Sequence, residues 1–314
     1  MRRAAALRRV AKTGKFLVPV VIAFFVGRVI QSNWAQIRAA EWDVQPLYLV
    51  GSAVLCSSWF WCRPLGWSLL VNGFGQPVPF TAVYRVVRRA ELSRFIPGGV
   101  WQFASRVYLV KKWNVSASSA LSATVIDLVL TTLAALVPAL WSLATAFPEL
   151  GQVQRVALIG FSLLSIAVLH PRIFNSWAGF VFRRLGQRYV HLEIHWRTLL
   201  GIWAMYVGSW ILMCAGVALF IRGVIEVEPG GTTFIGSSYA VAWLAGNFAM
   251  ISPAGMGIRE GVLGLLLAQW MPDGPAFALA IGVRLWLLLL EVGWVSVGEF
   301  LPRPEPAPEI SPGQ

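Results

Sequence analysis

Long apolar runs separated by short polar segments dominate the pattern of this chain. A transmembrane helix needs about twenty mostly apolar residues. The runs that meet this length predict crossings over 14–33, 46–71, 117–147, 154–170, 198–222, 232–251 and 275–299. Two further pieces, 83–110 and 258–272, are too short or too polar for ordinary crossings, and we interpret them as re-entrant or half helices. The pattern therefore predicts an all-α, polytopic transmembrane helical bundle of about seven or eight spans with two broken helices.

Two proline–glycine breaks interrupt the apolar pattern, and both carry charge. The first contains Arg94, Pro97, Gly98, Gly99, Gln102 and Arg106, and the second contains Ser252, Pro253, Gly255, Arg259 and Glu260. Irregular backbone and ionised side chains persist at membrane depth only inside protein or beside a water-filled cavity. The two prolines lie 156 residues apart in a chain of 314. Broken segments at corresponding points of two halves indicate a transporter's binding site.

Composition places the chain in the membrane. Residues of the AVILMFWYC class make up 57% of it and charged residues only 13%, with a mean hydropathy of +0.66. A soluble domain has about a quarter charged residues, so we expect an integral membrane protein. The net charge of +12 lies mostly in short segments that flank apolar runs. This is the positive-inside pattern, and no basic domain that would bind nucleic acid is visible.

The basic segments also predict orientation. Arginines and lysines crowd the first fifteen residues and the loops 72–95 and 171–197, which we expect to face the cytoplasm. The short segments 148–153 and 223–231 carry glutamates and would face outward. The chain is accordingly predicted to be a multi-pass protein of the inner (cytoplasmic) membrane with its N-terminus in the cytoplasm.

A single membrane domain is expected over 1–301, with halves of about 1–153 and 154–301. The segment 302–314 is rich in proline and is predicted to be disordered.

The first break has the elements of a phosphate cradle. Pro97 cannot donate a hydrogen bond, and the Gly98–Gly99 pair permits backbone geometries closed to other residues. A helix that starts just after them would point unpaired N–H groups into the protein, between Arg94 and Arg106. Guanidinium groups bind phosphate oxygens in a planar, bidentate manner. An amphipathic hairpin at the membrane surface, with arginines reaching lipid phosphates, explains the same charges.

The second break has a similar composition. Ser252 precedes it, Gly255 loosens the backbone, and Arg259 with Glu260 opens a short apolar helix. Asn247 lies upstream and would reach the same cavity. Ionisable residues at membrane depth are functional candidates by default, although Arg259 and Glu260 would also satisfy one another.

Three more charges lie inside predicted spans, namely Asp127, Arg284 and Glu291. One economical arrangement pairs Asp127 with Arg284 and Glu291 with Arg259. Structural ion pairing and substrate contact explain these three residues equally well. Arginines in or near the membrane outnumber carboxylates, and such an excess suits an anionic headgroup. The arginines are Arg63, Arg94, Arg106, Arg259 and Arg284, against Asp127, Glu260 and Glu291.

Signatures of enzymes and cofactors are missing from the pattern. His191 and His195 would share one helical face, but their spacing is not that of a metalloprotease and no third ligand accompanies them. There is no phosphate-binding P-loop, no GxSxG and no CxxC. We therefore expect neither a metal, a cofactor nor a catalytic residue.

The run from Leu92 to Lys112 resembles the conserved core of the lysylphosphatidylglycerol synthase transmembrane region, also called the flippase-like domain family. Asn247 through Glu260, followed by Arg284 and Glu291, resembles its second signature. The resemblance covers nearly the whole chain and implies movement of an aminoacylated phospholipid between leaflets, without the separate synthase domain. Relatives also accompany enzymes of polyprenyl-linked sugar assembly. The family often has Glu where this chain has Asp127.

Two functions follow as expectations. The first is translocation of an anionic or aminoacylated phospholipid, or a polyprenyl-linked glycolipid, between leaflets. The alternative is an accessory subunit that transports nothing and scaffolds a lipid-modifying enzyme or glycosyltransferase. The first requires the two breaks to meet within the bundle and to line a hydrated, cationic cavity.

Overall fold

A computed structural model describes the chain in two main parts. The described residues are 31–146 without 33, 76 and 97–99, and 195–302 without 228–230 and 250–251, with a few isolated positions between 152 and 176. All regular elements in these parts are helices, which confirms the all-α membrane bundle. The predicted crossings 14–33 and 154–170 and the tail 302–314 fall almost entirely outside the described residues.

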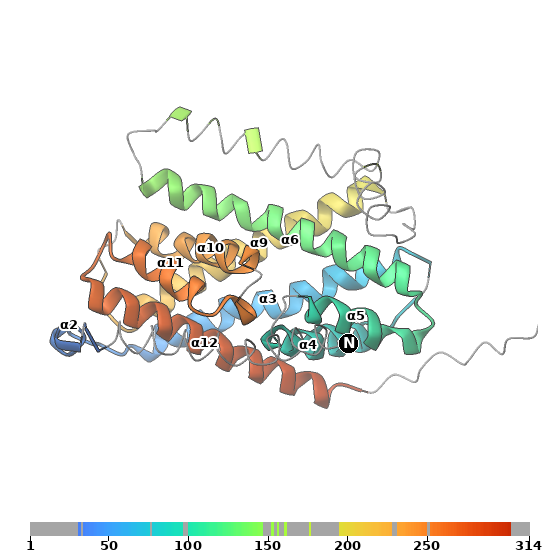
Figure 1. Ribbon diagram of the computed structural model, residues 1–314, viewed down its shortest axis with the longest axis horizontal. Coiled ribbons are helices and arrows are strands. Elements are labelled where there is room, and N and C mark those ends of the chain that lie inside the picture. Colours follow the sequence, from blue (N-terminus) through green and yellow to red (C-terminus); the bar gives the residue numbers. More distant parts are fainter. Residues whose placement is uncertain are drawn as a thin grey trace, which may run out of the picture.

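Four long helices form the body of the bundle (Figure 1). They are α3 (Pro46–Asn72), α6 (Ala117–Ala146), α9 (Trp196–Arg222) and α12 (Asp273–Phe300). Each coincides with a predicted crossing. Three of them, α6, α9 and α12, contain segments long and apolar enough to cross a membrane. Within a helix the backbone N–H and C=O groups bond to one another, and this is needed in a membrane because lipid tails offer no hydrogen-bond partners.

Helices α3 and α9 approach each other closely because small residues lie between them. Gly216 on α9 faces Ser52 and Cys56 on α3, and a Cβ atom at Gly216 would lie 3.1 Å from the Ser52 carbonyl oxygen. Small residues at helix contacts let backbones approach, which is a main source of packing energy inside membranes.

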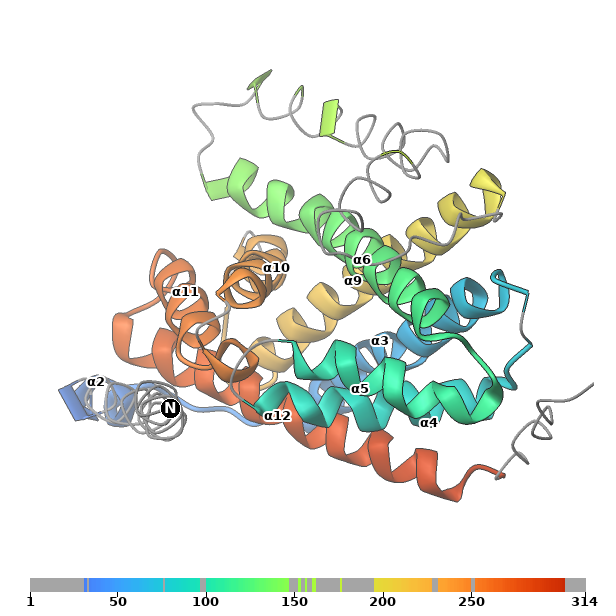
Figure 2. The ribbon, with the colours of Figure 1, turned by 45° about the vertical axis from the view of Figure 1, so that its right-hand side comes forward.

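Two helical hairpins complete the described bundle (Figure 2). One consists of α4 (Phe80–Leu92), the short helix η1 (Ser93–Phe95) and α5 (Trp101–Val110); the other consists of α10 (Thr232–Phe248), η5 (Pro253–Gly255) and α11 (Ile258–Leu267). We call them hairpin 1 and hairpin 2. The arms pack on each other, α4 on α5 and α10 on α11, and η1 contacts η5. Hairpin 2 lies on the left of Figure 1 and hairpin 1 on the right, so their turns meet in the middle.

Three of the four hairpin arms are too short to be ordinary crossings. Helices α5 and α11 have 10 residues each and α4 has 13. At about 1.5 Å per residue they are far shorter than a hydrocarbon core of about 30 Å. The re-entrant interpretation of 83–110 and 258–272 therefore agrees with the structure. The run 232–251, predicted as an ordinary crossing, forms α10 over 17 residues and is followed by the turn into hairpin 2.

Helix α4 occupies Phe80–Leu92, within the basic segment 72–95 that was predicted as a cytoplasmic loop, and the half helix predicted over 83–110 covers only its later part. Its apolar residues recur at helical spacing, and Val83, Val86 and Val87 are buried. On its other face the Arg85 Nε donates to the Gly298 carbonyl at 2.7 Å, which ties α4 to the end of α12. Sequence reasoning took the arginines as a loop signal and overlooked the apolar stripe between them.

The other end of α12 is also held. The short helix α2 (Trp34–Ala39) places Gln36 so that its side-chain oxygen accepts a hydrogen bond from the Gly274 N–H at 2.8 Å. That N–H lies in the first turn of α12, where backbone donors have no partner within the helix.

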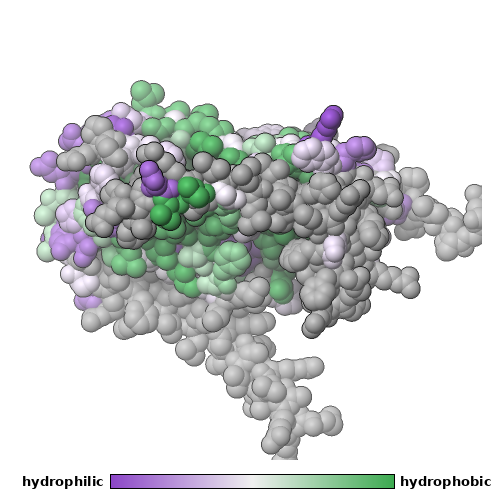
Figure 3. Space-filling model, turned by 90° about the horizontal axis from the view of Figure 1, so that it is seen from above, coloured by the Kyte–Doolittle hydropathy of each residue, from purple (hydrophilic) through white to green (hydrophobic). Residues whose placement is uncertain are grey.

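The surface pattern is that of a protein in lipid. On the face shown in Figure 3, apolar residues occupy the middle of the described surface and hydrophilic residues gather toward its two ends. On α12, Leu285, Leu289 and Val292 are exposed in the folded chain. A soluble protein rarely exposes such a continuous apolar surface, whereas lipid tails cover one.

Candidate functional site

The two hairpin turns enclose a polar cavity of about 180 Å³. Hairpin 1 contributes Arg94 and Gln102, and hairpin 2 contributes Asn247, Ser252 and Arg259. These residues are far apart in the sequence and were all predicted as site residues. Pro97, Gly98 and Gly99 lie outside the described residues. The structure thus brings the two breaks together at one cavity, which polar and apolar residues line together.

A smaller chamber of about 40 Å³ adjoins the cavity. Five residues line both spaces, namely Trp59, Glu91, Arg94, Trp243 and Arg259. The chamber extends the site toward α12, where it is lined by Arg284 and Glu291. Cavity and chamber are therefore two parts of one site.

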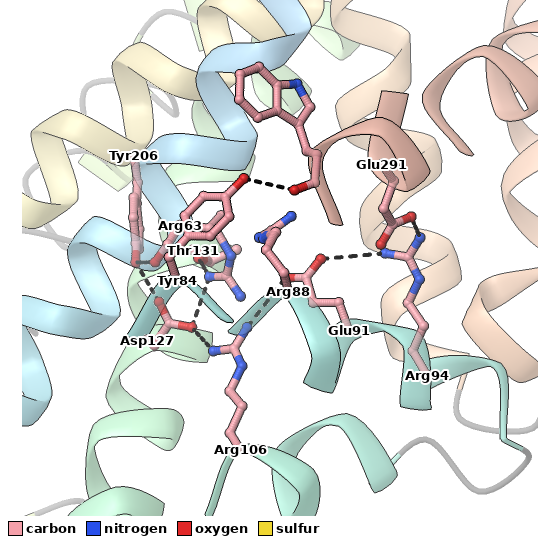
Figure 4. Close-up of polar contacts among 11 residues, drawn as sticks. Arg63, Tyr84, Arg88, Glu91, Arg94, Arg106, Asp127, Thr131, Tyr206 and Glu291 are labelled. Carbon is pink, nitrogen blue, oxygen red and sulfur yellow. Dashed lines mark hydrogen bonds and ion pairs between the residues drawn. The ribbon is translucent and has the colours of Figure 1, made fainter. Parts of the chain in front are cut away.

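One side of the site is a network of buried ion pairs around Asp127 (Figure 4). Its Oδ2 accepts from Arg106 at 2.7 Å and lies 3.0 Å from Arg63, while its Oδ1 accepts from the Tyr206 hydroxyl at 2.5 Å. Asp127 is only 1% exposed. A carboxylate at this depth is tolerable because both of its oxygens have partners.

The network continues through Glu91 to α12. Glu91 lies 3.3 Å from Arg88 and 3.4 Å from Arg106, and Arg94 approaches it at 3.9 Å. Arg94 also forms an ion pair with Glu291. Alternating charges thus connect α6, α5, α4, η1 and α12, as Figure 4 shows. Opposite charges at contact distance compensate for lost hydration.

Glu91 and Arg88 are site residues that sequence reasoning missed. Both lie where the basic segment 72–95 overlaps the half helix predicted over 83–110, and both are buried. The apolar stripe of α4 was the available signal, because it places Arg88 and Glu91, three residues apart, on one face of a helix.

In hairpin 2, two of the predicted site residues hold the turn. Glu260 accepts a hydrogen bond from the Gly257 N–H at 2.5 Å, which caps the start of α11. Its other oxygen lies 3.4 Å from the Arg284 Nε. Arg284 also donates to the Ala254 carbonyl at 3.2 Å. The α11 N-terminus is therefore occupied by the chain's own carboxylate.

The turn needs this support because its backbone is unusual. Ala254 has a φ of 53°, in the left-handed region that costs a residue with a side chain about 1–2 kcal/mol. Gly255 and Gly257 follow with φ of 67° and 82°, which glycine adopts readily. Such strain persists only where surrounding contacts fix the conformation.

Arg259 differs from every other buried charge of the site. It is 8% exposed, yet no carboxylate in the described parts of the chain forms an ion pair with it. Its side chain lies against two glycines, since a Cβ at Gly246 or Gly255 would come within 2.7 or 2.9 Å of its Nε. Its guanidinium lies 5.6 Å from the ring centre of Trp243. Packing therefore fixes the position of this cation while leaving its charge unpaired.

Three tryptophans form the apolar wall beside Arg259. The ring centre of Trp210 lies 4.9 Å from those of both Trp59 and Trp243, in edge-to-face geometry. The Arg63 guanidinium lies over the ring of Trp59, 5.3 Å from its centre. Such a wall excludes water from one side of the guanidinium and strengthens its electrostatic interactions.

The conjectured ion pairs were wrong. Asp127 pairs with Arg63 and Arg106 rather than with Arg284, which pairs with Glu260. Glu291 pairs with Arg94 rather than with Arg259. The cause is geometric: the hairpin turns bring residues of the breaks to the long helices, and helix spacing in the sequence does not reveal this.

The polar residues of the site carry an excess of positive charge. Six guanidinium groups and four carboxylates belong to the two breaks and their partners in the described residues. They are Arg63, Arg88, Arg94, Arg106, Arg259 and Arg284, against Glu91, Asp127, Glu260 and Glu291. Two formal positive charges remain, the same excess that the predicted residues gave.

Nothing in the described residues resembles a metal site, since no group of three or more His, Cys, Asp or Glu lies together there. His191 lies outside those residues. Cys56, Cys62 and Cys214 are free thiols.

Comparison with known proteins agrees with this architecture. The sequence profile of the family described as "Lysylphosphatidylglycerol synthase TM region" matches residues 14–292. No curated protein and no solved structure matches the chain significantly. The profile covers both hairpins and all four long helices except the end of α12, so the chain belongs to this family, whose members are membrane proteins related to lipid handling.

Proposed function

From this membership, we propose that the protein moves an anionic lipid between the two leaflets through the cavity between the hairpin turns. The substrate is an anionic or aminoacylated phospholipid, or a polyprenyl-linked glycolipid. One observation supports the proposal above all others. Arg259 is a buried cation without an ion-pair partner in the described residues, and it lines a cavity of about 180 Å³.

The cavity offers the contacts that a phosphate-bearing headgroup needs. The Arg259 guanidinium provides charge-assisted donors, which bind phosphate more strongly than neutral groups do. Gln102 and Asn247 line the same space and provide neutral donors and acceptors for the rest of the headgroup. The acyl or prenyl chains would stay in the bilayer, because the outward faces of the helices are apolar.

The hairpins supply a means of opening the cavity to either side. They enter the bundle from opposite ends, and their turns touch through η1 and η5 (Figure 2). Movement of one hairpin relative to the other would open the cavity on one side and close it on the other. Rocking of repeats around a central site is the usual form of alternating access.

The remaining expectations belong to the same proposal. The lipid is moved without covalent change, so the protein is not an enzyme and its partner is the lipid or lipid-linked sugar. We place the protein in the inner membrane with a cytoplasmic N-terminus, on the distribution of basic residues.

The accessory-subunit alternative has one observation in its favour. The network around Asp127 and Glu91 is internally paired and needs no ligand. A scaffold for a lipid-modifying enzyme or glycosyltransferase would require only such structural pairs, and it would leave Arg259 unexplained.

Reconstitution separates the two functions. The purified protein is placed in liposomes with a headgroup-labelled fluorescent anionic phospholipid or a labelled polyprenyl phosphate, and a membrane-impermeant quencher reports leaflet exchange. Transport predicts fast exchange in wild type and at least a tenfold loss in Arg259→Gln, equivalent to about 1.4 kcal/mol. The matched control is Arg89→Gln, since Arg89 is an exposed arginine paired with Glu299 on the surface.

Each outcome has a clear meaning. Exchange in Arg259→Gln at the wild-type rate contradicts the proposal. No exchange of either lipid by a folded wild type, together with stoichiometric recovery of an enzyme partner, supports the scaffold. Mass spectrometry of the lipid after incubation checks that it is chemically unchanged.

A further inference from the structure

Arg259 has no ion-pair partner in the described residues, and a lipid headgroup would neutralise its charge only while the lipid is bound. An arginine cannot lose its proton at physiological pH, so it cannot become neutral when buried. The carboxylate next to it, Glu260, is already engaged by Gly257 and Arg284. An isolated buried cation is strongly unfavourable without an anionic partner.

The carboxylates of the chamber do not supply that partner. Glu91 and Glu291 both line the chamber, and both pair with Arg94. Neither carboxylate therefore forms an ion pair with Arg259. The Oε1 of Glu291 is buried without a hydrogen-bond partner among the described residues, so it would repel an anion deep in the chamber. Glu291 does not line the cavity, and an anion is therefore expected at the end of the chamber that opens into the cavity. The network and second break together retain two formal positive charges.

The chamber has the size and the donors for a small anion. Its volume of about 40 Å³ exceeds the roughly 10–15 Å³ that one water needs, and it leaves no room for a large organic acid. The Nε atoms of Arg94 and Arg259 are buried and have no hydrogen-bond partner among the described residues. The tryptophan wall formed by Trp59, Trp210 and Trp243 favours an ion that loses its hydration easily.

We infer that a small inorganic anion, of the size and charge of chloride, binds beside Arg259 where the chamber meets the cavity, and that it neutralises this residue when no headgroup is present. The anion site itself does not require transport. Only the second part of the inference, in which a lipid phosphate replaces the anion, rests on the proposed function.

Thermal unfolding of the delipidated protein in detergent tests the site. Chloride is compared with gluconate, which is too large for the chamber, at equal ionic strength and pH. Chloride at ten times its Kd should raise the Tm by about 2 °C, because a ligand that binds only the folded state stabilises it. Arg259→Gln should abolish this rise, and Arg89→Gln should leave it unchanged. Equal Tm values of the wild type in the two salts, or an undiminished rise in Arg259→Gln, would overturn the inference.

A direct measurement guards against a variant that does not fold. Binding of radioactive chloride to the wild-type protein should saturate at about one ion per chain, and Arg259→Lys, which keeps the charge, should retain binding at reduced affinity. Saturation with phosphatidylglycerol in mixed micelles should remove the bound chloride if both use the same guanidinium. Chloride that stays bound at full lipid occupancy contradicts the exchange.

The two proposals fail in different ways. Chloride-dependent stability without any lipid movement contradicts transport and leaves the anion site in place. Lipid movement that proceeds equally in chloride and gluconate, with no bound chloride, contradicts the anion site alone.

Discussion

The two breaks are built from similar residues, yet they treat their charges differently. In hairpin 1, Arg94 and Arg106 both pair with carboxylates, and Arg106 is only 2% exposed. In hairpin 2, Glu260 pairs with Arg284 of α12, while Arg259 has no ion-pair partner in the described residues. The difference teaches that a buried charge in a membrane protein is evidence of ligand binding only when its neighbours have left it uncompensated.

The first kind of charge is structural. Asp127 and Glu91 receive guanidinium groups from α3, α4 and α5, so the network fixes hairpin 1 against the long helices. The second kind is held by packing, through Gly246, Gly255 and Trp243. Substitutions in the ion-pair network should therefore lower the free energy of unfolding, whereas substitutions around Arg259 should mainly lower the rate of lipid exchange.

Loss of the Asp127 carboxylate should have the largest effect, and on stability. Asp127→Asn leaves Arg63 buried without an ion-pair partner and Arg106 with Glu91 alone, which we expect to cost about 3–5 kcal/mol. The free energy of unfolding, measured by denaturant titration in detergent micelles, checks this. Asp127→Glu keeps the charge and should recover most of the loss. A stable Asp127→Asn protein would contradict the structural role of the network.

A smaller effect, on transport more than on stability, is expected from Gly246→Ala. The new Cβ would come within 2.7 Å of the Arg259 Nε, so the guanidinium must move from its place beside Trp243. We expect at least a tenfold lower rate of lipid exchange, with a loss of stability of about 1–3 kcal/mol from overpacking.

The matched control lies in the same hairpin. A Cβ at Gly261 meets no atom within 4 Å, and alanine favours helix, so Gly261→Ala should fold and transport as well as the wild type. Equal losses in the two glycine variants would show that hairpin 2 is merely sensitive to alanine.

The smallest effect is expected from Trp243→Leu. It removes the aromatic face over which Arg259 lies and keeps an apolar side chain, so the guanidinium loses a contact of about 0.5–2 kcal/mol. The apparent affinity for the labelled lipid should fall by roughly 2- to 30-fold, with a smaller change in maximal rate. Titration of the lipid content of the liposomes measures both. A fall in maximal rate alone would argue against a role of Trp243 in positioning Arg259.

The comparison also shows what the sequence could predict. The breaks are local features, because proline and glycine restrict or free their own backbone, so Pro253 and Gly255 were found without a structure. The apolar runs likewise predicted α3, α6, α9 and α12, because the length of an apolar run is also a local feature of the sequence. These predictions needed no knowledge of how distant segments meet.

Partner choice among buried charges was not predictable. Arg94 meets Glu291 across 197 residues of sequence, and this depends on how far each hairpin enters the bundle and on the rotation of α12. Glu91 was missed because its neighbours Arg88 and Arg89 were interpreted only as part of a basic segment that faces the cytoplasm. The unpaired state of Arg259 followed only from seeing where every carboxylate around it goes.

Helix α12 is fastened near both of its ends, by Gln36 of α2 at Gly274 and by Arg85 of α4 at Gly298. It also touches α11, so both hairpins rest on this one rod. A pair of spectroscopic probes, one on α12 and one on the turn of either hairpin, would therefore measure how far that turn moves relative to α12.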